Sequence, residues 1–240
     1  MANWEQRTAL MLSEEGLKKL HQAHVLVVGL GGVGAYAAEQ LCRAGVGQLT
    51  IVDGDVVEET NRNRQLPALI STNGKPKAEI LKERFWDINP DLKIQVIHEY
   101  LKGERMIEIV HKAQYDYVVD AIDTLAPKVF LIYHSRQANL PIVSSMGAGG
   151  KFDPTLVQQT DLSKSYNCKL ARMLRKNLHK LGVRKGIKVV FSSEKVDPKR
   201  IRIEESRNKK SVVGTISYMP PVFGCFCASV VIRDLIAVND

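Results

Sequence analysis

Short apolar runs alternate with helical patterns along the first 150 residues of the chain. Four of these runs are only four or five residues long, as strands buried on both faces of a sheet are; they lie at Val25–Val28, Leu49–Val52, Tyr117–Ala121 and Pro141–Ser145. A fifth strand, Ile94–Tyr100, alternates apolar and polar residues. Helices are predicted between the strands, at Ala35–Ala44, Lys77–Asp87, Glu104–Lys112 and Leu125–Asn139. This alternation predicts an α/β fold with a Rossmann-like, doubly wound and mainly parallel sheet.

Other patterns occur at the two ends of the chain. Trp4–Leu20 is predicted to form a pair of short helices, the second of which is capped by Ser13. Beyond the sheet we expect a basic helix with a leucine stripe, a strand, a charged and partly mobile stretch, and a final helix, at Asp161–Leu181, Lys188–Ser193, Asp197–Lys210 and Phe223–Val238. We therefore expect residues 1–150 to form a nucleotide-binding part and residues 151–240 a basic α+β extension of the same globular unit.

The turn after the first strand has the pattern G-x-G-x-x-G, with glycines at Gly29, Gly31 and Gly34. Glycine allows a tight turn and lets the backbone approach a phosphate or ribose, and the helix that follows offers free N–H groups to an anion. Asp53 ends the second strand, where a carboxylate can accept hydrogen bonds from ribose hydroxyls. These features predict a nucleotide site. The alternative is a glycine-rich turn that serves only helix–strand packing.

A polar segment, Glu58–Gln65, follows the second strand past its carboxyl end, where open α/β sheets bind ligands. Its arginines offer forked donors suited to phosphate and its amides add neutral donors; these residues are Arg62, Arg64, Asn61, Asn63 and Gln65. Lys77 begins the next helix and is placed to reach the same phosphates, although an ordinary surface lysine is the alternative. Asp120 and Asp123 end a later strand, where an aspartate commonly holds Mg²⁺ or its waters or else caps the next helix.

The net charge of +8 is unevenly distributed. Residues 151–215 contain 17 Lys and Arg against 6 Asp and Glu, whereas residues 1–150 contain 16 against 18. A basic region of this kind favours a polyanion, most commonly nucleic acid, and a solvated lysine-rich surface is the alternative.

The four cysteines include no C-x-x-C pair, which favours a reduced, cytoplasmic protein without structural zinc. Of these, Cys225 and Cys227 are expected in the core, and Cys168 is expected to be a structural or surface thiol. No signal pattern is present at the N-terminus, and the apolar run Val222–Ile232 is too short to span a bilayer. We therefore expect neither export nor a membrane span.

Five motifs, in their order and spacing, resemble those of the adenylating enzymes related to ubiquitin-activating enzymes and bacterial sulfur-carrier activators. They are GLGGVG at Gly29–Gly34, DGD at Asp53–Asp55, NRNRQ at Asn61–Gln65, GKPK at Gly74–Lys77 and DAID at Asp120–Asp123. Within that superfamily the chain is similar to the tRNA threonylcarbamoyladenosine dehydratase branch, through QRTAL at Gln6–Leu10, SSMGAGG at Ser144–Gly150 and SYMP at Ser217–Pro220. The resemblance covers nearly the entire chain.

The resemblance implies ATP-dependent activation of a carboxylate, with ATP and Mg²⁺ as cofactors. Asp53 would contact the ribose, Arg64 and Lys77 would hold the β- and γ-phosphates, and Asp123 would position Mg²⁺. The rest of the implied ATP site consists of Gly29, Gly31, Gly34, Asp55 and Asn61. Arg7 matches the family's N-terminal arginine, which reaches across a homodimer to the partner's γ-phosphate.

The substrate that this branch implies is the threonyl carboxylate of N6-threonylcarbamoyladenosine in tRNA, which is cyclised with loss of water through an acyl-adenylate. The basic region would then dock tRNA through salt-dependent phosphate contacts.

Two alternatives to this function remain open. One is adenylation of the C-terminal glycine of a ubiquitin-like sulfur-carrier protein, although such enzymes usually bear two C-x-x-C zinc pairs. They also use a cysteine in the crossover segment, roughly where Cys168 lies, so a thioester or persulfide step and a sulfur-relay partner stay open. The other is a nucleotide-sensing or NAD(P)-binding module, which would not need the Asn61–Gln65 motif or Lys77.

Overall fold

The structure is a computed structural model and describes residues 4–202 and 212–237. Seven strands form one sheet in the order β3-β2-β1-β4-β5-β7-β6. Their bounds are β1 His24–Val28, β2 Gln48–Val52, β3 Lys93–Ile97, β4 Tyr117–Asp120, β5 Ile142–Ser145, β6 Val157–Asp161 and β7 Lys188–Ser192. Every neighbouring pair is parallel except β6 with β7. The predicted α/β fold with a doubly wound, mainly parallel sheet is confirmed.

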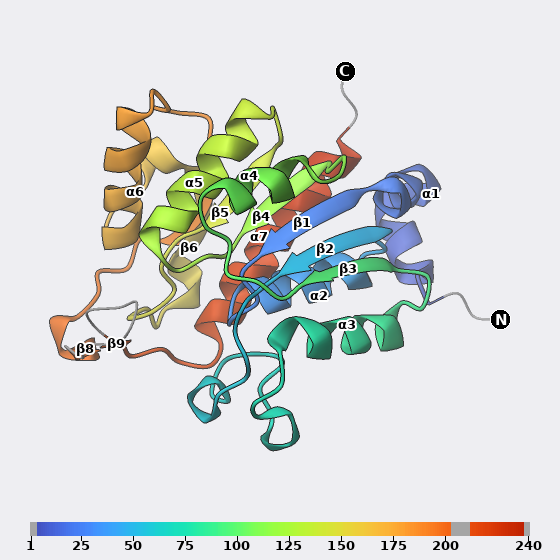
Figure 1. The fold of residues 1–240 in the computed structure, drawn as a ribbon, viewed down its shortest axis with the longest axis horizontal. Helices are drawn as coiled ribbons and strands as arrows, with labels where there is room; N and C mark the ends of the chain where they lie inside the picture. The colour runs from blue at the N-terminus through green and yellow to red at the C-terminus, as the bar shows by residue number, and fades with distance from the viewer. Residues whose placement is uncertain (1–3, 203–211, 238–240) are drawn as a thin grey trace.

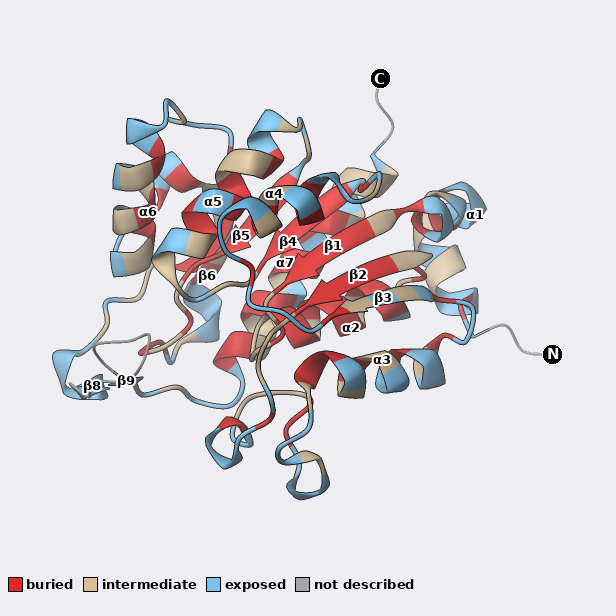
Figure 2. Ribbon diagram, in the orientation of Figure 1, coloured by how far each residue is buried: buried red, intermediate tan, exposed pale blue. Residues whose placement is uncertain are grey.

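Helices cover both faces of the sheet (Figure 1). They are α1 Gln6–Gln22, α2 Gly34–Arg43, α3 Lys77–Ile88, α4 Glu104–His111, α5 Leu125–Gln137, α6 Lys169–Lys180 and α7 Met219–Ile236. α7 packs against α1 and α2 on one face, and α5 packs against α4 and α6 on the other. The central strands are buried between these two layers (Figure 2). Their continuous apolar sequences follow from this, because neither face of the strands meets water.

The strand order reverses beside β1, which pairs with β2 on one side and with β4 on the other. Val28 lies opposite both Val52 and Asp120 in these pairings. The segments that follow these three residues therefore leave the sheet at one edge, where the reversed strand order of a doubly wound sheet opens a crevice for ligands. They are the glycine turn, the Asp53–Asp55 motif and the loop that carries Asp123.

The predicted helix Asp161–Leu181 is wrong in its first half. Residues Val157–Asp161 form the edge strand β6, and α6 begins only at Lys169. Asp161 ends the strand because its Oδ1 accepts from the Ser163 N–H at 2.8 Å and its Oδ2 accepts from the Gly186 N–H at 2.6 Å. Pattern alone missed β6, since only Val157 of its five residues is buried.

Two other predicted boundaries change by three or four residues. The strand predicted to reach Tyr100 ends at Ile97. The final helix begins at Met219 rather than Phe223, because a proline fits the first helical turn, where its missing N–H costs no hydrogen bond. Its predicted end, Val238, and residues 203–210 of the charged stretch lie outside the described residues. The helix pair before β1 is confirmed, since α1 is interrupted at Ser13, whose Oγ accepts from the Gly16 N–H at 3.3 Å.

Helix α7 is long and apolar enough to cross a membrane by length and composition alone. Its apolar side packs against α2 and the sheet, as the core helix of a globular protein does. Cys227 lies in this core, and burial raises the pKa of its thiol to about 12. Cys225 is exposed, so the expectation that both cysteines belong to the core is wrong for Cys225.

Candidate functional site

The glycine turn after β1 packs directly on the backbone that follows β4. Gly29 has a φ of +89°, and a Cβ there would lie 2.8 Å from the carbonyl oxygen of Ala121. A Cβ at Gly34 would lie 1.8 Å from the carbonyl oxygen of Gly29. Only glycine fits these two positions. At Gly31 the space is open, because within 4 Å a Cβ would meet only the Gln65 side chain among the described residues. A ligand can therefore approach the backbone there.

Asp53 holds the glycine turn in place. Its Oδ2 accepts from the Leu30 N–H at 2.6 Å, and its Oδ1 accepts from the Asp55 N–H at 2.7 Å. Burial raises the pKa of this carboxyl group, and the charge of Lys77 opposes that shift. A carboxylate offers about four lone-pair positions, so Asp53 retains acceptor capacity for hydroxyl groups of a ligand.

Lys77 is buried at the first residue of α3, with only 4% of its side chain exposed. Its Nζ lies 2.9 Å from Oδ2 of Asp55. The hydroxyl of Tyr100 donates to the other oxygen of Asp55 at 2.5 Å, which raises the pKa of Tyr100 to about 12. Lys77 is thus no ordinary surface lysine. Tyr100 was missed because its contact with Asp55 joins residues 45 positions apart.

The polar segment brings Arg64 towards Asp123. The guanidinium of Arg64 donates through Nη1 to the Thr60 carbonyl oxygen at 2.9 Å and to Oδ1 of Asn63 at 2.7 Å. Burial lowers the pKa of Arg64, and the charge of Asp123 opposes that shift. Arg64, which was predicted to bind phosphate, and Asp123, which was predicted to bind Mg²⁺, are therefore close enough for their charges to interact.

The amides of the same segment have structural partners. Asn61 is buried, and its Oδ1 accepts from the Glu58 N–H at 3.1 Å, so it shapes the short turn Glu59–Asn61. Asn63 donates through Nδ2 to the Thr215 carbonyl oxygen at 3.0 Å. Gln65 is different, since its Oε1 is buried without a hydrogen-bond partner among the described residues. A buried acceptor of this kind is costly unless a ligand or water satisfies it.

A buried charge cluster supports the loop that carries Asp123. Asp120 and Lys128 are both fully buried, and Oδ2 of Asp120 lies 2.9 Å from Nζ of Lys128. The Ser144 hydroxyl donates to the same oxygen at 2.6 Å, and Lys128 also donates to the Ile122 carbonyl oxygen at 2.8 Å. Neither aspartate is the N-cap of α5, because Thr124 takes that position. Lys128 was not predicted, since a lysine within an apolar helix gives no pattern for its burial.

Arg7 does not join these groups within its own chain. It is exposed on α1. The C-terminal end of α1 lies at the edge of the sheet opposite the glycine turn, because the Gly47 N–H, just before β2, donates to the Leu20 carbonyl oxygen. Figure 1 shows α1 beside the ends at which β1 and β2 begin. α1 and the glycine turn therefore lie at opposite ends of β1, which is five residues long.

The donor set fits Mg²⁺ bound together with a nucleotide. No group of three or more His, Cys, Asp or Glu that could hold a metal by itself occurs in the described parts of the chain. Mg²⁺ in nucleotide sites usually takes one or two carboxylates, with phosphate oxygens and waters as its other ligands. Asp123 at the carboxyl end of β4 supplies such a carboxylate.

Cys168 has a local structural contact. Its Sγ accepts from the Ala171 N–H at 3.5 Å and thereby caps α6. This contact gives the thiol a place at the start of α6, and the expectation of a structural or surface thiol stays a prediction.

Comparisons with known proteins match the whole chain. The ThiF family profile matches residues 5–239. The tRNA threonylcarbamoyladenosine dehydratase of Bacillus subtilis (strain 168) is 38% identical over 238 residues, which are 96% of this chain and 93% of that protein. Its namesake in Escherichia coli (strain K12) is 41% identical over 201 residues, covering 80% and 75%. The crystal structure of the E. coli dehydratase in complex with ATP matches with a TM-score of 0.87 at 36% identity, covering 97% and 95%.

Proposed function

This chain belongs to the ThiF family, and we propose that it is an ATP-dependent dehydratase that cyclises N6-threonylcarbamoyladenosine in tRNA. The observation that carries the proposal is the gathering of Arg64, Lys77 and Asp123 around one glycine turn. A relative that carries this activity in its name aligns with 96% of the chain. A similar protein has been solved with ATP bound.

In this proposal ATP lies against the glycine turn, over the open space at Gly31. Asp53 uses its remaining lone pairs to accept from the ribose hydroxyls, while its present hydrogen bonds keep the turn in shape. Lys77 and Arg64 contact the β- and γ-phosphates. Asp123 would hold Mg²⁺, and a bound Mg²⁺ would neutralise part of the phosphate charge. Asp55 keeps Lys77 in position before the nucleotide arrives.

The reaction requires two anions to approach each other. An oxygen of the threonyl carboxylate forms a bond to the α-phosphorus, and the bond from that phosphorus to the bridging oxygen breaks, so pyrophosphate leaves. The carbamoyl group of the same nucleoside then closes on the activated carbonyl carbon. The C–O bond to the phosphate breaks, AMP leaves with one oxygen of the original carboxylate, and one N–H proton of the carbamoyl group is released to solvent. Fixed cations lower the barrier because they offset the charge that develops at the α-phosphate.

Arg7 enters this scheme through a homodimer. Since α1 lies away from the nucleotide edge of its own sheet, its arginine can reach a triphosphate only in a second copy of the chain. We propose that the partner's site is completed in this way.

The basic region supplies the docking surface for tRNA. Four cationic side chains are exposed along α6, namely Lys169, Arg172, Lys176 and Lys180. Arg175 on the same helix has another role, because its guanidinium donates to the Leu162 and Ser165 carbonyl oxygens at 3.0 and 2.7 Å. The exposed set is available to tRNA phosphates, whereas Arg175 anchors the helix.

The test is to incubate the protein with ATP and Mg²⁺ together with either tRNA that bears threonylcarbamoyladenosine or a ubiquitin-like sulfur-carrier protein. We expect AMP and pyrophosphate with the modified tRNA alone, and a tRNA product lighter by one water. AMP release with the carrier protein but not with tRNA would contradict the proposal and favour the sulfur-carrier alternative.

A further inference from the structure

Three exposed side chains, Phe152, Tyr218 and Arg200, form a small surface that we call the Phe152 platform. Phe152 keeps 58% of its surface exposed. The Tyr218 ring lies 6.1 Å from it, centroid to centroid, at an interplanar angle of 66°. The Arg200 guanidinium lies 5.9 Å from the centroid of the Phe152 ring. An aromatic ring with a cation beside it is suited to a flat π-system.

The platform is held in place by hydrogen bonds to its backbone. The Tyr218 hydroxyl donates to the Phe152 carbonyl oxygen at 2.8 Å, and the Phe152 N–H donates to Oε2 of Glu194 at 2.6 Å. Arg200 donates through Nη1 to Oε1 of Glu194 and to the Gly150 carbonyl oxygen, both at 3.0 Å. One carboxylate therefore ties two members of the platform together.

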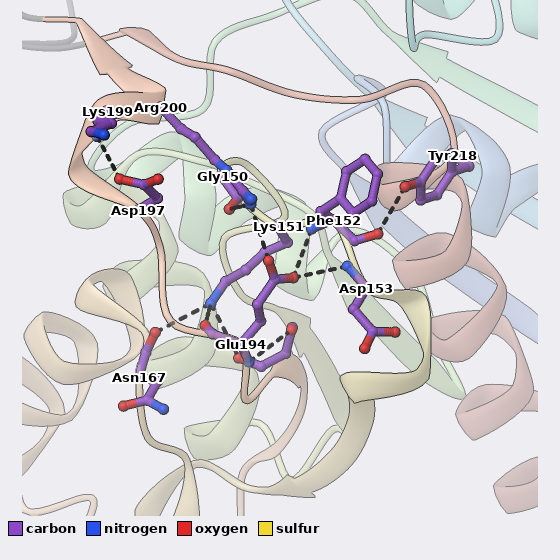
Figure 3. Close-up of polar contacts among 11 residues, drawn as sticks. Gly150, Lys151, Phe152, Asp153, Asn167, Glu194, Asp197, Lys199, Arg200 and Tyr218 are labelled. Atoms are coloured by element: carbon purple, nitrogen blue, oxygen red, sulfur yellow. Dashed lines mark hydrogen bonds and ion pairs between the residues drawn. The ribbon is translucent and has the colours of Figure 1, made fainter.

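Lys151, the residue before Phe152, anchors the platform's backbone inside the protein. It is 97% buried, and its Nζ donates to the carbonyl oxygens of Asn167 at 3.3 Å, Ser192 at 3.4 Å and Glu194. Figure 3 shows Lys151 directed to these carbonyl groups while the Phe152 ring points away from them, towards Tyr218. The backbone that carries the exposed ring is thus fixed by a buried ammonium group, so the ring is presented with little conformational freedom.

The platform adjoins the nucleotide site. Tyr218 is the N-cap of α7, and Pro220 in the first turn of that helix comes within 2.8 Å of where a Cβ would stand at Gly32 of the glycine turn. The segment before Tyr218 is also joined to the polar segment by the hydrogen bond from Asn63 to Thr215. A molecule resting on Phe152 therefore lies close to a nucleotide at the glycine turn.

An unpaired nucleobase fits this combination of features. RNA-binding proteins recognise splayed bases of single-stranded loops by stacking them on aromatic rings and guanidinium groups. Phe152 and Arg200 belong to the basic region, in which Lys195 and Lys199 are also exposed, and this charge favours a polyanion over a neutral peptide. We infer that Phe152 stacks a base adjacent to the modified adenosine and so positions the threonyl carboxylate at the α-phosphate. This inference rests on the proposed function.

The experiment uses the full chain with threonylcarbamoyladenosine-containing tRNA in which 2-aminopurine replaces, in turn, the nucleotide on each side of the modified base. Stacking quenches 2-aminopurine fluorescence. The variants are F152A, F152L and F152W, and F130A is the matched control because Phe130 is also exposed but lies on α5, away from the platform.

We expect F152A and F152L to weaken tRNA binding by roughly 5- to 100-fold, as loss of a stacking ring does. Both should also lose the quench at one of the two labelled positions, while ATP affinity stays as in the original protein. F152W should retain binding and quench, because it keeps an aromatic face where leucine keeps only apolar volume.

The inference is overturned if F152A or F152L binds and quenches as F130A does while the original protein still releases AMP with modified tRNA. It is also overturned if F152A instead impairs adenylation of a ubiquitin-like carrier, which would make the platform a peptide site. If the original protein itself releases no AMP with modified tRNA, the proposed function is wrong, and this inference, which rests on it, is wrong as well.

Discussion

The cations at the nucleotide edge and those on α6 are placed in opposite ways. Lys77 is buried against Asp55, and Lys128 is buried against Asp120. The four exposed cations of α6 face solvent, within a region, residues 151–215, that has nearly three times as many basic as acidic residues. Salt screens buried and partly buried pairs much less than it screens exposed charges. In our proposal the first region acts on a bound nucleotide, and the second attracts a large polyanion.

The most severe way to disturb the first region is to remove Lys128. We expect K128M to lower the free energy of unfolding by about 3–5 kcal/mol, because it leaves Asp120 buried without its counter-charge. Chemical denaturation measures the change. The double variant D120N/K128M should recover much of the lost stability, since it removes both charges. Unchanged stability of K128M would contradict the buried pair.

Loss of a residue predicted to bind phosphate or metal should slow turnover strongly without unfolding the protein. We expect D123A and R64A each to slow AMP release by roughly 100- to 1,000-fold, because each removes a group that stabilises charge in the transition state. The matched control is D91A, which removes an exposed acid beside β3. Full activity of D123A or R64A, with a melting temperature equal to that of D91A, would show that the residue replaced has no role in the reaction.

Removal of exposed cations should change salt dependence rather than chemistry. We expect K169Q/R172Q/K176Q to lower the slope of log affinity for tRNA against log salt by about 2 to 3, since each lost phosphate contact contributes about 0.7 to 0.9. ATP affinity should stay constant. K18Q/K102Q/K112Q is the control, because these three lysines are exposed outside the basic region. Equal slopes for the two triple variants would show that tRNA does not dock through these cations of α6.

The smallest effect is expected at Tyr100, an exposed residue whose hydroxyl donates to Asp55, the partner of the buried Lys77. Y100F removes the hydroxyl that donates to Asp55 but leaves the contact between Asp55 and Lys77. We expect the dissociation constant for ATP to change by less than about 5-fold, because hydrogen bonds to exposed groups contribute little. A larger loss, measured by isothermal titration calorimetry, would show that Tyr100 contacts the nucleotide directly.

The sequence predicts best where the signal is local. The glycine turn and the acid after β2 have fixed spacing, so their place at the carboxyl edge of the sheet follows from strand–helix alternation alone. The edge strand β6 escaped prediction because only one of its five residues is buried and because it pairs with a strand 31 residues further on. The period-3.6 pattern of leucines further on, which belongs to α6, led the predicted helix to begin too early, at Asp161.

Contacts between distant segments account for what was missed in the site. Lys128 and Tyr100 take part in it only because folding brings them to Asp120 and Asp55. Phe152 gains its role from Tyr218, 66 residues later, and from Arg200. The sequence did predict Arg64, Lys77 and Asp123 as one group through the resemblance, and their place near one another in the structure supports that prediction without testing their roles.

The central claim is that a carboxylate of the tRNA attacks the α-phosphate of ATP. The most direct measurement follows ¹⁸O from tRNA in which both carboxylate oxygens of the threonylcarbamoyl group are labelled. Our account predicts that one labelled oxygen appears in the phosphate of AMP and the other stays in the cyclic product. Unlabelled AMP, or label in inorganic phosphate, would contradict adenylation of the carboxylate.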